Sequence, residues 1–258
     1  MNPENTDEIR KSFTIQARNF ESAKMSFSKQ EYLDYTVESM ELNKNDRVLD
    51  AAAGTCACGR SVAPFVESVA CLDATEAMLE VGREEAKKSG IANMEFINGF
   101  VESMPFEDET FDIVITRLAF HHFTEMEKPF SEMDRVLKRG GKLVIIDMEA
   151  AEETLRDIED EIETMRDPSH VKNRSLDEFR RIYEKHGYIL TKQEATVIPV
   201  SLSAWMELTQ TPEDVCVEIE GLMKAELAGG ALTGFRPYTR DGEVYFEQRW
   251  VLFIGIKR

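Results

Sequence analysis

The segment Arg47-Val48-Leu49-Asp50-Ala51-Ala52-Ala53-Gly54-Thr55 is the most informative part of this 258-residue chain. It opens with a short apolar run that ends in an acid, and such a run is typical of a buried strand. Small residues follow at once, and Gly54 can adopt a positive φ without steric cost. The segment therefore predicts a buried strand that leads directly into a tight turn.

Strand and helix patterns alternate on the C-terminal side of this segment. Short apolar runs indicate strands within residues 69–72, 94–97, 111–116 and 142–147, and helical patterns occupy residues 76–89 and 128–137. Strands that alternate with helices at this spacing indicate βαβ units. The predicted fold class is therefore α/β, a doubly wound, mainly parallel Rossmann-like sheet with helices on both faces.

The N-terminal part of the chain is expected to be helical. Ile9, Phe13, Ala17 and Phe20 fall on one face of a helix, and a second helix is expected at residues 29–40. The pattern predicts an amphipathic N-terminal segment that packs against the sheet domain.

The C-terminal part mixes helices with extended stretches. An acidic helix is expected at residues 151–165, and its charged side chains are interpreted as a solvated face. Ser175 and Glu178 have the spacing of a capping box for the next helix. The extended stretches 188–200 and 244–256 are expected to be neighbours, separated by a helical insertion at about residues 201–240.

Composition and charge limit the class of protein. The chain has 31 Lys+Arg and 49 Asp+Glu, a formal net charge of −18, and 42% apolar residues. This balance predicts a soluble globular protein and argues against a nucleic-acid partner, because phosphate binding depends on Lys and Arg. The sequence shows neither a secretory signal nor an apolar run of membrane-spanning length, so we expect a cytoplasmic protein without a membrane span.

Three of the four cysteines, Cys56, Cys58 and Cys71, lie close together in the sequence. A metal site would require a second, well-separated pair of ligands, and none is present. We interpret the three cysteines as small buried apolar residues and expect no metal.

The first turn and an acid after it indicate a nucleoside ligand. Small side chains at Ala52, Ala53 and Gly54 let a ligand approach the backbone closely. Asp73 ends the second predicted strand, 19 residues after Gly54. An acid at about this spacing from the glycine turn accepts hydrogen bonds from two ribose hydroxyls. The glycine pattern of NAD-binding turns and the phosphate-binding Gly-Lys-Ser/Thr are both absent, which disfavours a nucleotide-dependent dehydrogenase.

Several segments resemble, in their order and spacing, the motifs of the class I S-adenosylmethionine-dependent methyltransferases. The resemblance rests on residues 48–55, Asp73-Ala74, Asn98-Gly99 with Met104-Pro105-Phe106, 111–114 and 136–143, and it extends from about residue 10 to residue 190. The pattern around Phe13, Ala17 and Phe20 is similar to the ubiquinone/menaquinone C-methyltransferase branch and its bacterial relatives. Some of those relatives share the segment Arg166-Asp167-Pro168-Ser169-His170.

The resemblance implies a cofactor, S-adenosylmethionine, with S-adenosylhomocysteine as its product. It implies cofactor contacts by Asp50, Ala52, Gly54, Asp73, Ala74, Met78, Phe100, Val101, Arg117 and Leu118. Two positions depart from the family pattern. Cys56 replaces the third glycine of the first motif, and Phe100 replaces an acid that would accept from the adenine amino group. A non-catalytic cofactor-binding sensor or scaffold is therefore an alternative.

The implied reaction is transfer of a methyl group to an acceptor. Its catalytic candidate is His121, a general base after the fourth strand; His122 and His170 are weighed beside it, with packing or turn formation as their alternatives. Residues considered for an apolar acceptor pocket, or for ordinary core packing, are Met104, Met148, Trp205, Met206 and Phe235. Arg18 and Arg60 are considered for the methionine carboxylate, or as surface residues.

The predicted organisation is one methyltransferase domain, residues 1–258. It comprises an N-terminal helical lid (1–45), a cofactor-binding core (46–150) and a C-terminal part (151–258) that contains the insertion before the last strand. The expected acceptor is a small molecule methylated at C or O, and an RNA or protein acceptor is the alternative. Both monomer and homodimer stay open.

Overall fold

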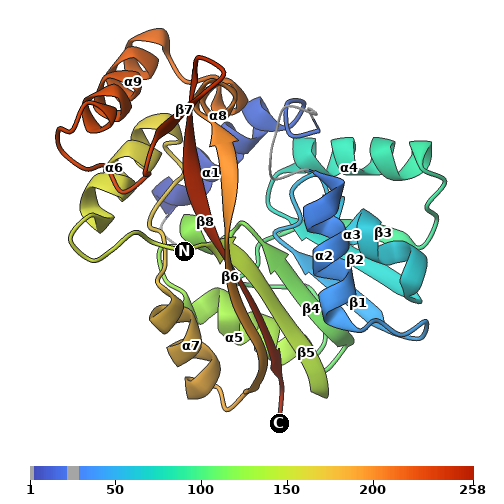
Figure 1. Cartoon of the computed structure of the whole chain (residues 1–258). Coiled ribbons are helices and arrows are strands. Elements are labelled where there is room, and N and C mark those ends of the chain that lie inside the picture. Colours follow the sequence, from blue (N-terminus) through green and yellow to red (C-terminus); the bar gives the residue numbers. More distant parts are fainter. Residues whose placement is uncertain (1–2, 22–28) are drawn as a thin grey trace.

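A computed structural model describes residues 3–21 and 29–258 of the chain. Its strands form one sheet in the order β3-β2-β1-β4-β5-β8-β6, with β7 paired to β8 (Figure 1). The strands are β1 (Arg47–Ala51), β2 (Ser68–Asp73), β3 (Met94–Asn98), β4 (Phe111–Arg117), β5 (Leu137–Met148), β6 (Ile189–Ser201), β7 (Tyr238–Arg240) and β8 (Glu243–Ile256). The pairs from β3 to β5 are parallel. The doubly wound α/β prediction is confirmed.

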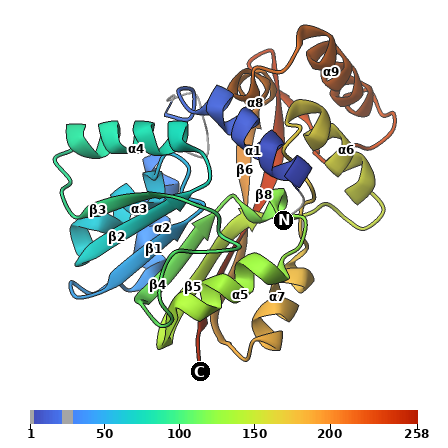
Figure 2. The same ribbon diagram turned by 180° about the vertical axis from the view of Figure 1, so that it is seen from behind.

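Helices cover both faces of this sheet, as Figures 1 and 2 show from opposite sides. The α-helices are α1 (Pro3–Gln16), α2 (Gln30–Met40), α3 (Ala57–Val62), α4 (Glu76–Lys88), α5 (Glu127–Val136), α6 (Arg156–Arg166), α7 (Leu176–Lys185), α8 (Leu202–Thr209) and α9 (Glu213–Leu227). Two 3-10 turns, η2 (Ala63–Phe65) and η3 (Phe120–His122), complete the described elements. The predicted capping box is present, because Ser175 and Glu178 bond reciprocally at the start of α7.

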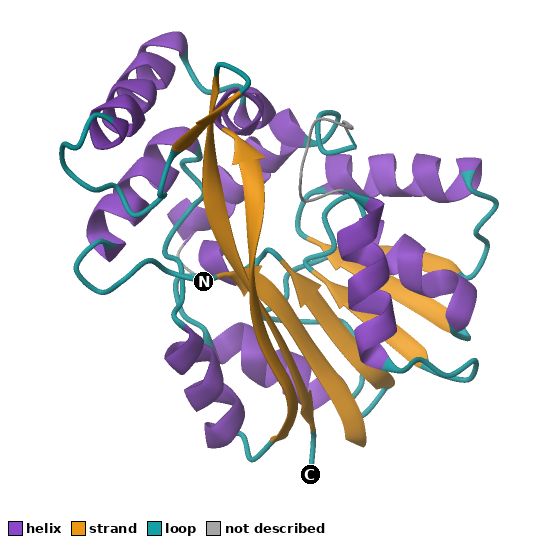
Figure 3. Ribbon diagram, viewed as in Figure 1, coloured by secondary structure: helices purple, strands orange, loops and turns teal. Residues whose placement is uncertain are grey.

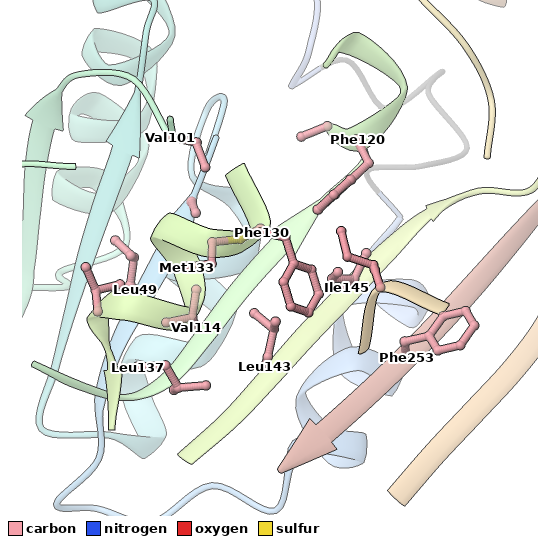
Figure 4. Packing of buried hydrophobic residues seen from close by; sticks show 14 of the residues in the cluster. Leu49, Val101, Val114, Phe120, Phe130, Met133, Leu137, Leu143, Ile145 and Phe253 are labelled. Atoms are coloured by element: carbon pink, nitrogen blue, oxygen red, sulfur yellow. The ribbon is translucent and has the colours of Figure 1, made fainter. Parts of the chain in front are cut away.

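Each face of the sheet has its own apolar core. On one face, Phe130 and Met133 of α5 pack toward Val114 and Leu143 of the sheet (Figure 4). On the other face, residues of α2, α3 and α4 pack on β1, β2 and β4. Sheet strands buried on both faces read as continuous apolar runs, which explains why β1, β4 and β5 are recognisable in the sequence.

The antiparallel end of the sheet carries the inserted segment. Strands β6 and β8 pair along their length, from Ile189 opposite Ile256 to Ser201 opposite Tyr245. The predicted neighbourhood of the two last extended stretches is thus confirmed, and α8 and α9 lie between them in sequence. Figure 3 shows β6 and β8 extending past the parallel strands toward α8.

The acidic helix corrects one expectation. Glu159 and Glu163 of α6 are buried rather than solvated. Glu159 pairs with Arg249 of β8 at 2.6 Å, and Glu163 pairs with Arg166 at 3.3 Å. Burial of a carboxylate is costly unless a partner compensates it, and here the arginines supply that compensation. No helix within residues 3–21 and 29–258 has the length and apolar character needed to cross a membrane.

Gly255 of β8 is required by close packing, which leads to a stability prediction. A Cβ at this position would lie 2.6 Å from Cδ1 of the buried Tyr183 ring. We expect Gly255→Ala to lower the free energy of unfolding by about 1–3 kcal/mol, because overpacking strains a filled core. Gly221 of α9 is the control, since nothing lies within 4 Å of its added Cβ. Gly221→Ala should stabilise the helix by about 0.5–1 kcal/mol. Urea unfolding of both variants measures the difference; equal stabilities would contradict the packing account.

Candidate active site

A cavity lies at the carboxyl edge of the parallel strands, where ligands bind in open α/β sheets. Most of its lining comes from the ends of β1 to β5, from α1, from the turn after α6 and from α8, and α3, η3, β6 and β8 contribute further residues. Figure 1 shows α1, α6 and α8 beyond this edge, whereas the C-terminus lies at the opposite end of the sheet. The cavity is therefore lined by segments that are far apart in the sequence.

The loop after β1 presents backbone to the cavity. Gly54 has φ +54°, and a Cβ added there would meet no atom within 4 Å. Ala52 also has a positive φ, 55°, which is unusual for a residue with a side chain. Asp50 lies below the loop and accepts a 2.8 Å hydrogen bond from the Gly59 N–H. Burial raises the pKa of Asp50 to about 7, although the Gly59 bond and Arg117 oppose that shift.

Cys56 occupies the position of the family's third glycine without entering the cavity. Its φ of 59° is the left-handed conformation that glycine favours. Its side chain is fully buried and belongs to the core, and it does not line the cavity. The substitution therefore keeps the backbone path of the turn and leaves the cavity open at this point.

Asp73 connects the ends of β1 and β2. One carboxylate oxygen accepts from the Gly54 N–H at 2.8 Å, and the other accepts from the Thr75 N–H at 2.8 Å. Burial raises the pKa of Asp73 to about 6, and these two backbone N–H groups limit the shift. The carboxylate also lines the cavity, so it can accept further hydrogen bonds from a ligand there.

The loop after β3 forms the far end of the cavity. Phe100, Val101 and Glu102 line it together with Ala74 from the loop after β2. Arg10 of α1 covers this end, since its guanidinium lies 4.7 Å from the Phe100 ring centroid. Arg10 Nε also donates to the carbonyl of Ala74 at 3.3 Å. The end thus combines apolar surface with one carboxylate.

His121 reaches the cavity from the turn after β4 and is held by a buried acid. Its Nδ1 lies 2.7 Å from Oδ1 of Asp147, which is 1% exposed. The same carboxylate accepts from the N–H groups of Ala119, Phe120 and Met148. Burial opposes ionisation of Asp147, but the His121 ring and these N–H groups lower its pKa below the usual value. In the neutral tautomer whose Nδ1–H donates to Asp147, Nε2 is the acceptor.

His122 packs between the turn after α6 and helix α1. Its Nδ1 lies 3.0 Å from the Ser169 carbonyl oxygen, and its ring packs edge-on against Phe13 of α1. Burial and the neighbouring His121 lower the pKa of His122 to about 3, so the ring is neutral at pH 7. His170 pairs with Asp160 at 2.9 Å through Nε2. His122 lines the cavity, as His121 does, whereas His170 does not.

The turn after α6 connects α1 to α8 at the cavity wall. Asp167 accepts from Gln16 Nε2 of α1 at 2.9 Å and from Ser169 Oγ at 2.6 Å. Arg166 lies 4.5 Å over the ring of Trp205 in α8. These contacts bring α1, the turn and α8 together over the same side of the cavity.

Most residues singled out in the sequence come together here. The predicted site residues that line the cavity are Asp50, Ala52, Gly54, Asp73, Ala74, Phe100, Val101, Arg117, Leu118 and His121. Met78 does not line it: this residue of α4 is fully buried. Met148 and Trp205 line the cavity, whereas Met104, Met206 and Phe235 are core residues.

The remaining candidates lie elsewhere. Arg60 pairs with Glu21 at 2.9 Å and is mostly buried, and Arg18 is exposed. Within the described residues, no group of three His, Cys, Asp or Glu side chains could hold a metal ion. The role of Asp147 was not anticipated, although it resembles Asp50 and Asp73 as an acid near the end of a buried strand. No pattern in the sequence indicates the Gln16–Asp167 bond or the place of Glu102 in the lining.

Comparisons with known proteins agree with this architecture. A family model described as a methyltransferase domain matches residues 42–217. The chain is 32% identical over 189 residues to the methyltransferase YcgJ of Bacillus subtilis (strain 168), covering 73% of this chain and 75% of YcgJ. It is 35% identical over 118 residues to the ubiquinone/menaquinone biosynthesis C-methyltransferase UbiE of Pasteurella multocida (strain Pm70), covering 44% of each chain.

The crystal structure of Bacillus subtilis YcgJ has the same fold, with a TM-score of 0.80 and 28% identity over 89% of this chain and 99% of YcgJ. The BH2331 protein of Bacillus halodurans C-125 also gives a TM-score of 0.80, with 29% identity over 88% of this chain and 99% of that protein. With the family match over residues 42–217, these similarities show that the chain belongs to the class I S-adenosylmethionine-dependent methyltransferases.

Proposed function

We propose that this enzyme transfers the methyl group of S-adenosylmethionine to carbon or oxygen of a small, largely apolar acceptor, with His121 as general base. The observation that carries the proposal is that Asp73 and His121, whose Nδ1 lies 2.7 Å from Asp147, line the same cavity. The Asp73 carboxylate suits a ribose, and the Asp147 carboxylate orients His121 to accept a proton.

The residues present fit the adenosyl cofactor. The Asp73 carboxylate can accept from both ribose hydroxyls, and the open space beside Gly54 lets the cofactor lie against backbone. Ala74, Val101 and Leu118 supply apolar surface for the base and the methionine chain. Arg117 borders the methionine end of the cavity, where its cation faces the ring of Trp250 at 5.1 Å.

The acceptor is proposed to lie on the side of His121 that faces away from the cofactor. Phe13 and Phe20 from the N-terminal segment, with Trp205 and Leu208 of α8, form a mainly apolar wall there. We propose α1 as the lid of a single domain, joined to that wall by the Gln16–Asp167 bond. His121 is only 6% exposed, which favours a small acceptor over the surface of an RNA or a folded protein.

When bound, the cofactor would supply a methyl group whose carbon is activated by the adjoining positively charged sulfur, and the acceptor nucleophile would displace S-adenosylhomocysteine from that carbon. The protein positions the acceptor in line and excludes water. His121 Nε2 removes the proton of the acceptor as the new bond forms, and Asp147 stabilises the imidazolium that results. Nδ1 stays protonated throughout and donates its hydrogen bond to Asp147.

The proposal is tested by following S-adenosylhomocysteine release with a panel of phenolic, enolic and alcoholic small molecules. We expect turnover with weakly acidic, apolar members, and mass spectrometry of the product locates the new methyl group. Methylation of RNA or of protein side chains, with none of the small molecules accepted, would contradict the acceptor class.

Cofactor affinity should depend on pH through Asp73. Ribose hydroxyls donate to the ionised carboxylate, and the pKa of Asp73 is raised by burial to about 6. Below that pH the protonated form predominates, so S-adenosylhomocysteine affinity should fall by up to about tenfold per pH unit. Calorimetry between pH 5 and 7.5 measures this. Asp73→Asn should lose the part of the dependence centred near pH 6; an unchanged profile in that variant would assign it to another group.

A further inference from the structure

We propose that Glu102 recognises the exocyclic amino group of the cofactor's adenine. The inference rests on the proposed binding of an adenosyl cofactor and deepens it, because it names the residue that distinguishes the base. It concerns the end of the cavity formed by the loop after β3.

The strand order determines where the base lies. Asp73 ends β2, which stands between β1 and β3 in the sheet. With the ribose on Asp73, the methyl group must point toward His121, which follows β4 on the far side of β1. The base then extends the other way, toward β3. The residues after β3 that line the cavity are Phe100, Val101 and Glu102.

Glu102 is the lining carboxylate whose hydrogen-bonding capacity is left over. Among the other acids of the lining, Asp50 accepts from Gly59, Asp73 from Gly54 and Thr75, and Asp167 from Gln16. Within the described part of the chain, the Glu102 carboxylate has its own backbone N–H as hydrogen-bond donor. Burial raises its pKa, which indicates a poorly solvated acceptor.

The surroundings of Glu102 explain why this residue takes the role. Phe100 carries no acceptor, and its ring instead supports the Arg10 guanidinium at 4.7 Å. Arg10 directs Nε to the Ala74 carbonyl, so it covers the base end of the cavity. An adenine amino group supplies an N–H donor for the Glu102 carboxylate, whereas a 6-oxo group would meet that carboxylate with a second acceptor.

The test compares S-adenosylhomocysteine with S-inosylhomocysteine, in which oxygen replaces the amino group. Calorimetry at pH 7.5 should show at least tenfold tighter binding of the adenosyl ligand to the unmodified protein, the range of a hydrogen bond to a charged group. Glu102→Met removes the acceptor at similar length. This variant should bind the adenosyl ligand about tenfold more weakly and the inosyl ligand equally or more tightly, so the preference falls to about twofold or less.

Glu107→Gln is the matched control, because Glu107 is an exposed acid of the same loop outside the cavity lining. It should keep the full preference, and thermal unfolding of both variants should match the unmodified protein. Equal binding of both ligands to the unmodified protein, or a preference that survives Glu102→Met, would overturn the role of Glu102 while the methyltransferase proposal stands. Failure to bind either ligand would overturn the cofactor site itself, and this inference with it.

Discussion

Replacement of Asp73 by Ala is expected to weaken S-adenosylhomocysteine binding by about 100-fold or more. Two ribose hydroxyls lose a charged acceptor, and each hydrogen bond to a charged group contributes about 1.5–3 kcal/mol. The carboxylate also fixes the Gly54 and Thr75 N–H groups, so the loop that faces the cofactor loses its support as well. Isothermal titration of the folded variant measures the loss.

Asp112 provides the control for this variant. It lies at the start of β4, accepts from the Arg47 N–H at 3.0 Å and pairs with Lys138 at 2.7 Å, but it does not line the cavity. Asp112→Ala should affect stability and leave cofactor affinity within about threefold. Unchanged affinity in Asp73→Ala, with circular dichroism showing a native fold, would contradict the ribose assignment.

The second large effect is expected at His121, the proposed general base. His121→Gln should lower kcat by about 10²–10⁴-fold on a productive acceptor, since this is the usual contribution of general acid–base catalysis. Asp147→Asn should have an effect in the same range for a different reason. An amide donates to Nδ1 and moves the histidine proton to Nε2, where it blocks acceptance of the acceptor's proton. S-adenosylhomocysteine affinity should stay within about threefold in both variants.

His186 is the matched control, because it pairs with Glu127 at 3.0 Å and does not line the cavity. His186→Gln should keep normal turnover. Nitrogen-15 NMR gives a second readout: the His121 resonances of the unmodified protein should report a proton on Nδ1, and those of Asp147→Asn a proton on Nε2. A full rate in His121→Gln would remove the base from the mechanism.

The order of strands and helices could be predicted from the sequence, because the central strands are buried on both faces. Residues 113–115 and 143–146 are uninterrupted apolar runs, and the helices between strands have clear stops such as Gly90. Pairing of β6 with β8 was also predictable, since both are long extended stretches. The local pattern of apolar residues was sufficient to predict a strand or helix wherever burial alternates regularly along the segment.

Contacts between distant segments were harder to predict. The burial of Glu159 depends on Arg249, which lies 90 residues away in sequence. Helical periodicity predicts a charged face for α6. It does not predict that this face is buried, because burial depends on the cation that Arg249 of β8 supplies. The same limit applies to Met78: its place after β2 is compatible with a cofactor contact, yet α4 turns the side chain into the core.

The site shows a similar division. Asp50, Gly54 and Asp73 could be found because strand ends and a tight turn place them at one edge. The place of His121 at the cavity could be predicted from its position after β4, but its contact with Asp147 depends on how η3 lies against β5. Asp147 nevertheless has a sequence signal, since an acid near the end of a buried strand also marks Asp50 and Asp73.

Titration calorimetry of the purified protein with S-adenosylmethionine, S-adenosylhomocysteine and NAD tests the account most directly. The proposed site should bind each adenosyl ligand once per chain and should not bind NAD, because the turn at residues 52–56 lacks the glycine pattern for a pyrophosphate. Stoichiometric binding of both adenosyl ligands, abolished by Asp73→Ala, is the predicted result. Binding of NAD in their place, or no binding of either adenosyl ligand, would contradict it.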